Sequence, residues 1–130
     1  MLRPLVPPSI RPPFARYSHA IEVASGARLV FVSGQLGVNP DDSVPATVEE
    51  QAKRCFANIA AILEEAGLGL ADIVRISAYV TAREHMKGYM SVRDRLVGDP
   101  PPASTLMIVS GFARPEFLVE IEVVAAGAPR

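Results

Sequence analysis

Two glutamates near the end of the chain are the first residues whose types and spacing could do chemistry. Glu120 and Glu122 lie in the run 117–126, where the alternation of side chains is typical of a β-strand. Side chains two positions apart share one face of a strand, about 7 Å from each other. A carboxylate in apolar surroundings is favoured in its neutral form and exchanges protons more readily near neutral pH. Glu120 is therefore the first candidate for a general base.

The cysteine and the histidines indicate less. Cys55 is the only cysteine, so an internal disulfide is excluded and a reducing compartment fits. It lies on the apolar stripe of a predicted helix, which favours a small core residue over a nucleophile. His19 and His85 are far apart in sequence, with no carboxylate at ligand spacing. We therefore expect neither a metal nor a cofactor.

Short motifs along nearly the whole chain resemble those of the Rid family, also called YjgF or L-PSP. They are Tyr17, the Val-Ser-Gly-Gln run 32–35, the Val-Asn-Pro run 38–40, Gln51-Ala52, Asn58, the Glu-Ala-Gly-Leu run 65–68, the Asp-Ile-Val run 72–74, Pro102-Ala103 and the closing run 118–122. This resemblance implies a chorismate-mutase-like α+β fold. It also implies a homotrimer with small-molecule sites in clefts between subunits.

The resemblance also implies site residues. Deaminases of the family hydrolyse a reactive imine or enamine to a keto acid and ammonia. By position, Tyr17 matches the site tyrosine that orients the ligand, and Ser33 and Gly34 match a strand end whose backbone holds it. Glu120 matches the glutamate that positions the attacking water. These four residues carry over from the family pattern.

One departure changes the expected substrate. The family's deaminases carry an arginine directly after the Pro-Ala step, and this chain has Ser104 there. A serine hydroxyl is one uncharged donor and cannot replace a bidentate guanidinium. Ordinary 2-iminoacid deamination is therefore expected to be weak or absent. Met90 stands near the usual helix asparagine, and Leu106 or Met107 replaces the usual cysteine.

Three further residues have two interpretations each. Ser104 and Thr105 either line a smaller, less charged pocket or merely suit the geometry of a strand. Arg114 either reaches a cleft from its loop or is an ordinary surface arginine. We also expect Glu122 to pair with a basic residue across a subunit interface.

Composition limits the class of protein. With 130 residues, 49% hydrophobic and 21% charged, we expect one domain over 1–130, with a proline-rich arm over 1–16. The net charge of −1 provides no field for phosphates, so RNA binding is not expected. The proline-broken N-terminus does not resemble a secretory signal, and no run is long enough to span a membrane. A cytoplasmic protein is expected.

The predicted elements follow the order ββαβαββ. They are a hairpin of strands 20–23 and 29–35, a helix from the Thr47–Glu50 capping box to Gly67, a strand 73–80, a helix from Thr81 to about Val97, and strands 104–110 and 117–126 around a turn. The strand 29–35 is apolar on both faces and is expected to be covered on both. Two helices cover one face of such a sheet, so the other face is expected to need a partner.

These observations leave two functional hypotheses. The first is a Rid-type hydrolase acting on an imine or enamine other than a standard 2-iminoacid. The second is a trimer that binds a small molecule or another protein without catalysis.

Overall fold

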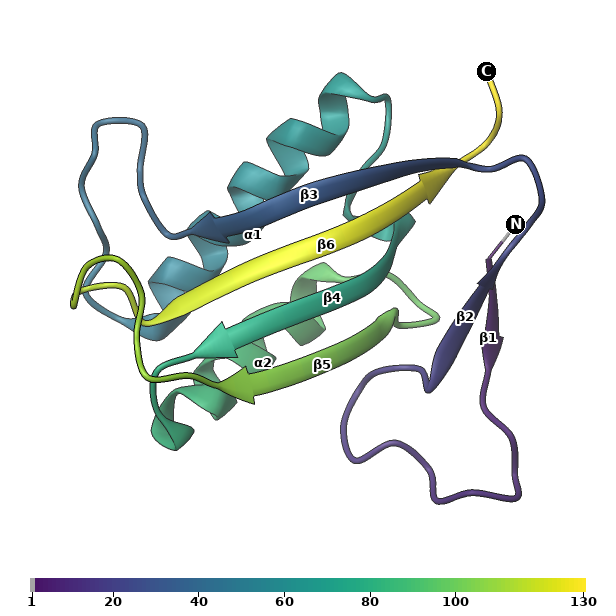
Figure 1. Cartoon of the computed structure of the whole chain (residues 1–130), viewed down its shortest axis with the longest axis horizontal. Coiled ribbons are helices and arrows are strands. Elements are labelled where there is room, and N and C mark those ends of the chain that lie inside the picture. Colours follow the sequence, from purple (N-terminus) through teal and green to yellow (C-terminus); the bar gives the residue numbers. More distant parts are fainter. Residues whose placement is uncertain (1) are drawn as a thin grey trace.

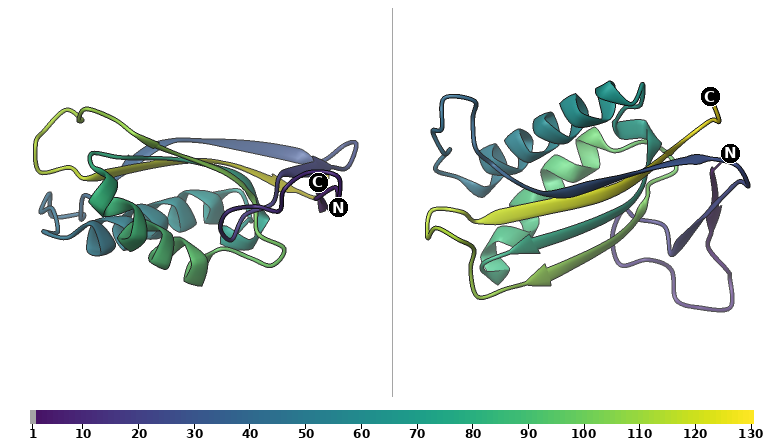
Figure 2. Two further views of the ribbon diagram at one scale, coloured as in Figure 1. Left: turned by 90° about the horizontal axis from the view of Figure 1, so that it is seen from below. Right: turned by 45° about the horizontal axis from the view of Figure 1, so that its top comes forward.

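The computed structural model describes residues 2–130, which form a mixed sheet with two α-helices packed on one of its faces (Figures 1 and 2). The strands are β1 (Leu2–Leu5), β2 (Ala20–Val23), β3 (Arg28–Leu36), β4 (Ile73–Val80), β5 (Ala103–Ile108) and β6 (Val119–Gly127). The helices are α1 (Val48–Glu65) and α2 (Met86–Leu96), and the short 3₁₀ turns are η1 (Leu70–Asp72) and η2 (Arg83–His85). The predicted α+β class is confirmed.

The main sheet has the strand order β3-β6-β4-β5. β6 runs antiparallel to both of its neighbours, whereas β4 and β5 are parallel and are joined through α2. The last two strands were predicted to lie around a turn, but they do not pair. The α2 crossover places β5 on one side of β4, and the loop 109–118 carries the chain to the other side, so that β4 separates them.

The predicted hairpin between strands 20–23 and 29–35 is wrong. β3 pairs with β6, from Arg28 opposite Gly127 to Leu36 opposite Glu120. β2 pairs instead with β1, with Leu2 opposite Val23 and Leu5 opposite Ala20, and forms a separate ribbon beside the sheet (Figure 1). The proline-rich arm thus contains a strand that the sequence pattern did not predict. This strand, β1, pairs with β2 in place of β3, whose partner is β6.

The two helix starts differ from expectation in detail. Thr47 caps α1 by accepting a hydrogen bond from the Glu50 amide at 3.2 Å. The Glu50 carboxylate pairs with Lys53 at 3.0 Å, so only half of the predicted capping box forms. α2 begins at Met86 rather than just after Thr81, because η2 occupies the intervening residues and no side chain caps the helix.

The core lies between the two helices and the sheet. Phe56, Ile59 and Leu63 of α1 pack with Ile76 of β4 and Ile121 of β6, and all five are fully buried. Burying a side chain of this size contributes about 1.5 to 3 kcal/mol. The helical face of the sheet is therefore held firmly enough to position residues on the opposite face.

That opposite face carries no helix, and we call it the open face (Figure 2). Leu29 and Phe31 of β3 and Met107 of β5 are 51%, 75% and 53% exposed there. The prediction that the strand 29–35 is covered on both sides is thus wrong for the single chain, because α1 covers only the Val30 and Val32 side. No helix within residues 2–130 is long and apolar enough to cross a membrane.

Candidate functional site

The side chain of Glu120 lies against bare backbone of β3. A methyl group built on Gly34 would stand 2.7 Å from the Glu120 carboxyl carbon, which is closer than atoms approach in real structures. Glu120 is half-buried on the open face, opposite Leu36 on β3 and Tyr79 on β4. The absence of a side chain at Gly34 is what makes room for the carboxylate.

Ser33 and Gly34 form an irregularity in the sheet. The β3–β6 register runs through Val32 opposite Val123, skips the next two residues of β3, and resumes at Gln35 opposite Ile121. Such a β-bulge leaves backbone groups outside the ladder and re-aims side chains. Gly34 therefore lies at a bulge, and the group that approaches its backbone closely is Glu120.

Glu122 lies on the same face, two residues further along β6. Its Oε1 accepts a hydrogen bond from the Tyr79 hydroxyl at 2.7 Å. This bond to Glu122, together with burial and the charges of both glutamates, raises the pKa of Tyr79 above its usual value of 10.0. Tyr79 therefore remains a protonated donor to Glu122, and the basic partner expected for Glu122 across a subunit interface stays a prediction.

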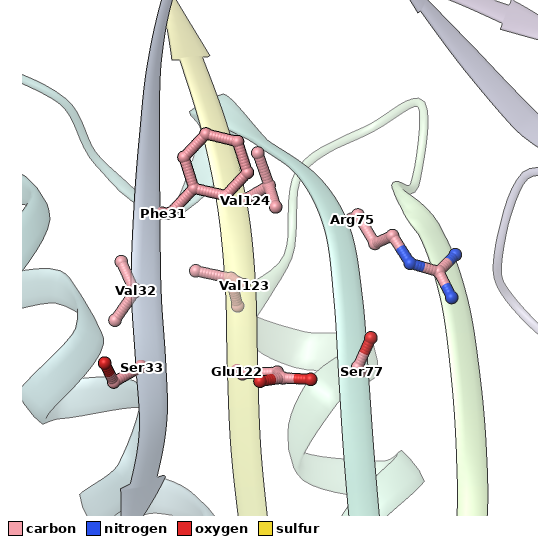
Figure 3. A pocket seen from close by; sticks show the side chains of 8 residues that line it. All are labelled: Phe31, Val32, Ser33, Arg75, Ser77, Glu122, Val123 and Val124. Carbon is pink, nitrogen blue, oxygen red and sulfur yellow. The ribbon is translucent and has the colours of Figure 1, made fainter.

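A hollow of about 340 Å³ opens on this face (Figure 3). It is lined by Phe31, Val32 and Ser33 of β3, Arg75 and Ser77 of β4, and Glu122, Val123 and Val124 of β6. Ser33 is therefore a lining residue, while Gly34 and Glu120 lie beside the hollow. The lining combines valines and an aromatic ring with one cation, one anion and two hydroxyls.

Arg75 and Tyr79 were missed by sequence reasoning. The signal was available, because Arg75, Ser77 and Tyr79 alternate with buried residues along β4 and must share its outer face. The Arg75 guanidinium donates to the Thr105 hydroxyl of β5 at 2.8 Å. The prediction of a strand over 73–80 was not extended to the polar face that these three residues form.

Tyr17 lies toward the other end of the sheet from Glu120, whereas Thr105 lies opposite Ser77 and is level with Glu122, two strands away. Ser18 pairs with Ala103, which lies opposite Arg75, which in turn lies opposite Val124. Val124 is four residues from Glu120, or about 13 Å along the strand, and two strand spacings of about 4.8 Å separate β6 from β5. The Tyr17 hydroxyl accepts a hydrogen bond from the Phe14 amide at 3.3 Å. One chain therefore does not bring Tyr17 and Glu120 together.

Ser104 faces the helices rather than the open face. Its register partner Ile76 is fully buried, and the Ser104 hydroxyl is buried with no hydrogen-bond partner in residues 2–130. The hydroxyl approaches Tyr89 of α2, as does the buried guanidinium of Arg93. Burial raises the pKa of Tyr89 to about 12, so this cluster is a neutral phenol, a hydroxyl and a cation.

Arg114 lies in the loop 109–118, at the Glu120 end of the sheet (Figure 1). Its guanidinium lies 4.5 Å from the Phe117 ring centre and its Nε is 3.8 Å from Glu116. It lines a separate hollow of about 390 Å³ with Thr81 and other residues of the loop. The loop therefore holds Arg114 by its own neighbours, on the same side of the molecule as Glu120.

Two further kinds of group were considered, the thiol of Cys55 and potential metal ligands. Cys55 is fully buried, and its thiol donates to the Gln35 carbonyl at 3.2 Å. Burial and the charge of Glu120 raise the pKa of Cys55 to about 12, which keeps it an unreactive thiol. Among residues 2–130, no group of three potential ligands could hold a metal ion.

The fold, together with a carboxylate that lies against a β-bulge, defines the class: small α+β proteins with a candidate site on the open face of the sheet. The family model described as Endoribonuclease L-PSP matches residues 9–127. A RutC family protein of Pyrococcus abyssi is 34% identical over 115 residues, covering 87% of each chain. A solved structure from Yersinia pestis, a protein of unknown function of the conserved Rid protein family, has a TM-score of 0.81 and 26% identity, covering 97% of this chain and 98% of that one.

These findings show that the chain belongs to the Rid family, also known as the YjgF or L-PSP family. One relative carries an activity in its name: a 2-iminobutanoate/2-iminopropanoate deaminase of Dermatophagoides farinae is 27% identical over 121 residues, covering 92% of this chain and 88% of that protein.

Proposed function

We propose that this chain is a Rid-type hydrolase of a reactive imine or enamine, with Glu120 as the general base. The observation that carries the proposal is the Glu120 carboxylate lying against the bare backbone of Gly34 at the β3 bulge. Membership of a family with a named imine deaminase supports the reaction class. The proposed ligand-holding groups beside Glu120 are Ser33 and the backbone of Gly34.

The proposed reaction is hydrolysis of a carbon–nitrogen double bond. Glu120 takes a proton from a water molecule as the water oxygen bonds to the imine carbon. The protonated Glu120 returns this proton to the imine nitrogen, which gives an amino alcohol and restores the carboxylate. The hydroxyl proton of the amino alcohol then passes to nitrogen, the carbon–nitrogen bond breaks, and ammonia leaves a carbonyl product. An enamine first gains a proton at carbon and so becomes the imine. The water supplies the carbonyl oxygen, and no oxidant or reductant takes part.

We propose that the complete site is a cleft between subunits of a homotrimer. Ser33, Gly34 and Glu120 form one group, Tyr17 lies beside the far end of the sheet, and Thr105 lies on β5, two strands from β6. Tyr17 and Glu120 are too far apart in one chain to contact one small ligand. A neighbouring copy that covers the open face would bring its Tyr17 to the Glu120 group. Tyr17 then orients the ligand, and Thr105 contributes a hydroxyl.

The proposed substrate is not a standard 2-iminoacid. Each charge-assisted hydrogen bond of a guanidinium to a carboxylate contributes about 1.5 to 3 kcal/mol, and about 1.4 kcal/mol is tenfold in binding. Ser104 supplies no such bond, and its hydroxyl points toward Tyr89 beneath the sheet. Arg114, which lies on the Glu120 side of the molecule, is the second candidate for a ligand contact. A neutral imine or enamine, or one anchored differently, fits this arrangement better.

The alternative is a trimer that binds a small molecule without catalysis. The same placement of Ser104 favours it, because the residue that stands at the family's anchor position makes no contact with the open face. In that case Glu120 would hold a ligand donor or an amide of the neighbouring subunit, with no proton transfer.

Ammonia release decides between the two functions. Imines are generated in situ from a series of amino acids by an amino-acid oxidase, and ammonia is followed with the wild-type chain, Glu120→Gln, and Glu84→Gln as an exposed control. Loss of a general base is expected to lower the rate by about 10²- to 10⁴-fold, whereas the control retains it. Release at the background rate for every substrate, unchanged in Glu120→Gln, would leave only the binding function.

A further inference from the structure

The loop between β1 and β2, which carries Tyr17, lies beside the main sheet (Figure 1) and is fastened on both sides of that residue. Arg16 donates to the Gly98 carbonyl at 2.9 Å, just beyond the end of α2. Ser18 is buried, and its hydroxyl donates to the Pro101 carbonyl at 2.6 Å. These contacts hold Tyr17 in place, although most of the arm is exposed.

Three further residues gather around Tyr17. The Phe14 amide donates to the Tyr17 hydroxyl at 3.3 Å, and the Tyr17 and His19 rings meet edge to face with 6.3 Å between their centres. The His19 Nε2 lies 2.8 Å from the Arg11 carbonyl. The Arg11 guanidinium in turn lies over the Phe14 ring, 3.8 Å from its centre. These contacts close into one group, which we call the arm cluster: Arg11, Phe14, Tyr17 and His19.

The arm cluster lies on the side of the molecule to which the open face turns. Tyr17 and His19 contact each other across Ser18, so their side chains point away from the buried side that Ser18 occupies. His19 accordingly lines a hollow with Arg75 and Val124, two residues of the open face. A neighbouring copy that covers the open face therefore meets the arm cluster together with Tyr17.

Arg11 brings a guanidinium with free donors to this cluster. A guanidinium has five N–H groups, and within residues 2–130 Arg11 uses one of them, to the Pro12 carbonyl at 3.0 Å. No carboxylate in the same part of the chain lies within 4 Å of it. Stacking on Phe14 occupies the flat face of the guanidinium and leaves the N–H groups at its edge. A carboxylate can therefore bind Arg11 through two parallel hydrogen bonds.

The other arginines near the proposed cleft are directed elsewhere. The Arg16 guanidinium turns to the end of α2, and the Arg75 guanidinium donates to Thr105. Arg114 lies beside Glu116 in its own loop. Arg11 is thus the guanidinium that accompanies Tyr17.

We propose that Arg11 anchors a carboxylate on the side chain of the substrate, which makes the substrate an imine or enamine of a dicarboxylic acid. This inference rests on the proposed function, in which Tyr17 orients the reacting end of the ligand. Arg11 is one residue further out in the chain of contacts, beyond Phe14, so it meets the far end of the ligand. The Phe14 ring is 80% exposed and offers a surface to the methylene groups between the two ends. Ser104 provides no cation for a carboxylate at the imine carbon, so the second carboxylate supplies the charged contact.

Ammonia release from two imines of five carbons tests the proposal. 2-Iminoglutarate, generated by an oxidase from L-glutamate, ends in a carboxylate, and 2-iminopentanoate, generated from L-norvaline, ends in a methyl group. We expect kcat/KM to be at least about tenfold higher for 2-iminoglutarate, because it gains the charge-assisted contact. Arg11→Gln should remove this advantage, mainly through KM, and leave 2-iminopentanoate unchanged. Arg3→Gln is the matched control and should keep it, because Arg3 is exposed on β1 and already pairs with Glu22 at 3.1 Å.

Binding of glutarate, measured by calorimetry, tests the anchor without the reaction. Glutarate is expected to bind Arg11→Gln at least about tenfold more weakly than the wild-type protein or Arg3→Gln. The inference is overturned if the wild-type protein does not bind glutarate, if folded Arg11→Gln keeps its affinity, or if the two imines are hydrolysed with equal efficiency. Glutarate binding that depends on Arg11, with no ammonia release from any imine, would support the anchor and reject the hydrolase.

Discussion

Gly34 shows how one missing side chain can shape a site. Its backbone lies where Glu120 needs space, and the nearest atoms to an added Cβ would be the carboxyl carbon of that glutamate at 2.7 Å and its Cγ and Oε2 at 3.0 Å each. The far end of a flexible side chain moves more easily than backbone. A substitution at Gly34 should therefore displace the carboxylate while leaving the sheet intact.

Gly34→Ala is predicted to lower the rate of ammonia release by about 10²-fold, because a displacement of about 1 Å at a catalytic group is enough for such a loss. The unfolding midpoint should change little. Gly69→Ala is the matched control, since nothing lies within 4 Å of its added Cβ. Full activity in Gly34→Ala, with activity lost in Glu120→Gln, would show that the close packing of the two residues is not needed.

Sequence reasoning at this scale found residues and missed their neighbours. The alternation of 117–126 correctly placed Glu120 and Glu122 on one face, because a strand period of two is a local property. It could not show that Tyr79 is the donor to Glu122, because that contact joins residues 43 positions apart. Nor could the motif at Ser104 reveal that its hydroxyl faces Tyr89, because side-chain direction depends on the pairing of β5 with β4.

At the scale of elements, the sequence predicted strands better than their partners. The bounds of β2 and β4 match the expected 20–23 and 73–80, since apolar patterns and flanking turns are local signals. The failed hairpin has the opposite origin. β3 is drawn to β6 by contacts over about ninety positions of sequence, and the turn after β2 carries no information about that competitor.

One buried amide joins the elements around Glu120. Gln51 of α1 is fully buried, and its Nε2 donates to the carbonyls of Pro45 and Glu116 at 2.8 Å each. Its Oε1 accepts the Leu118 amide at 2.9 Å, directly before β6 begins. The side chain thus anchors two loops on the helix and fixes the start of the strand that carries Glu120.

Gln51→Leu is predicted to lower the free energy of unfolding by at least about 2 kcal/mol, because each buried polar group left unpaired costs about 1 to 3 kcal/mol. Urea unfolding followed by circular dichroism measures the change. Glu64→Leu, at an exposed position of the same helix, is the control and should stay within about 0.5 kcal/mol of the parent. Equal stability of Gln51→Leu and the parent would rule out this anchoring role.

At the scale of the whole molecule, the open face is the main departure from a self-sufficient fold. The helices bury one side of the sheet, while Leu29, Phe31 and Met107 remain largely exposed on the other. The sequence predicted an uncovered face from the excess of apolar strand residues over helices to cover them. The number of subunits could not come from such a count, and the homotrimer is proposed from the family resemblance alone.

The last prediction concerns the mass of the assembled protein and the contribution of the Phe31 ring to assembly. Light scattering after gel filtration is expected to give about three times the monomer mass of 13.9 kDa. Phe31→Asp is expected to shift the protein toward monomer, because each copy loses the burial of an aromatic ring, about 1.5 to 3 kcal/mol, and would have to desolvate a carboxylate. Ile62→Asp, on α1 away from the open face and 38% exposed, is the control and should remain assembled. A wild-type protein that elutes as a monomer would leave the Tyr17 and Glu120 groups apart, and the proposed cleft would not exist.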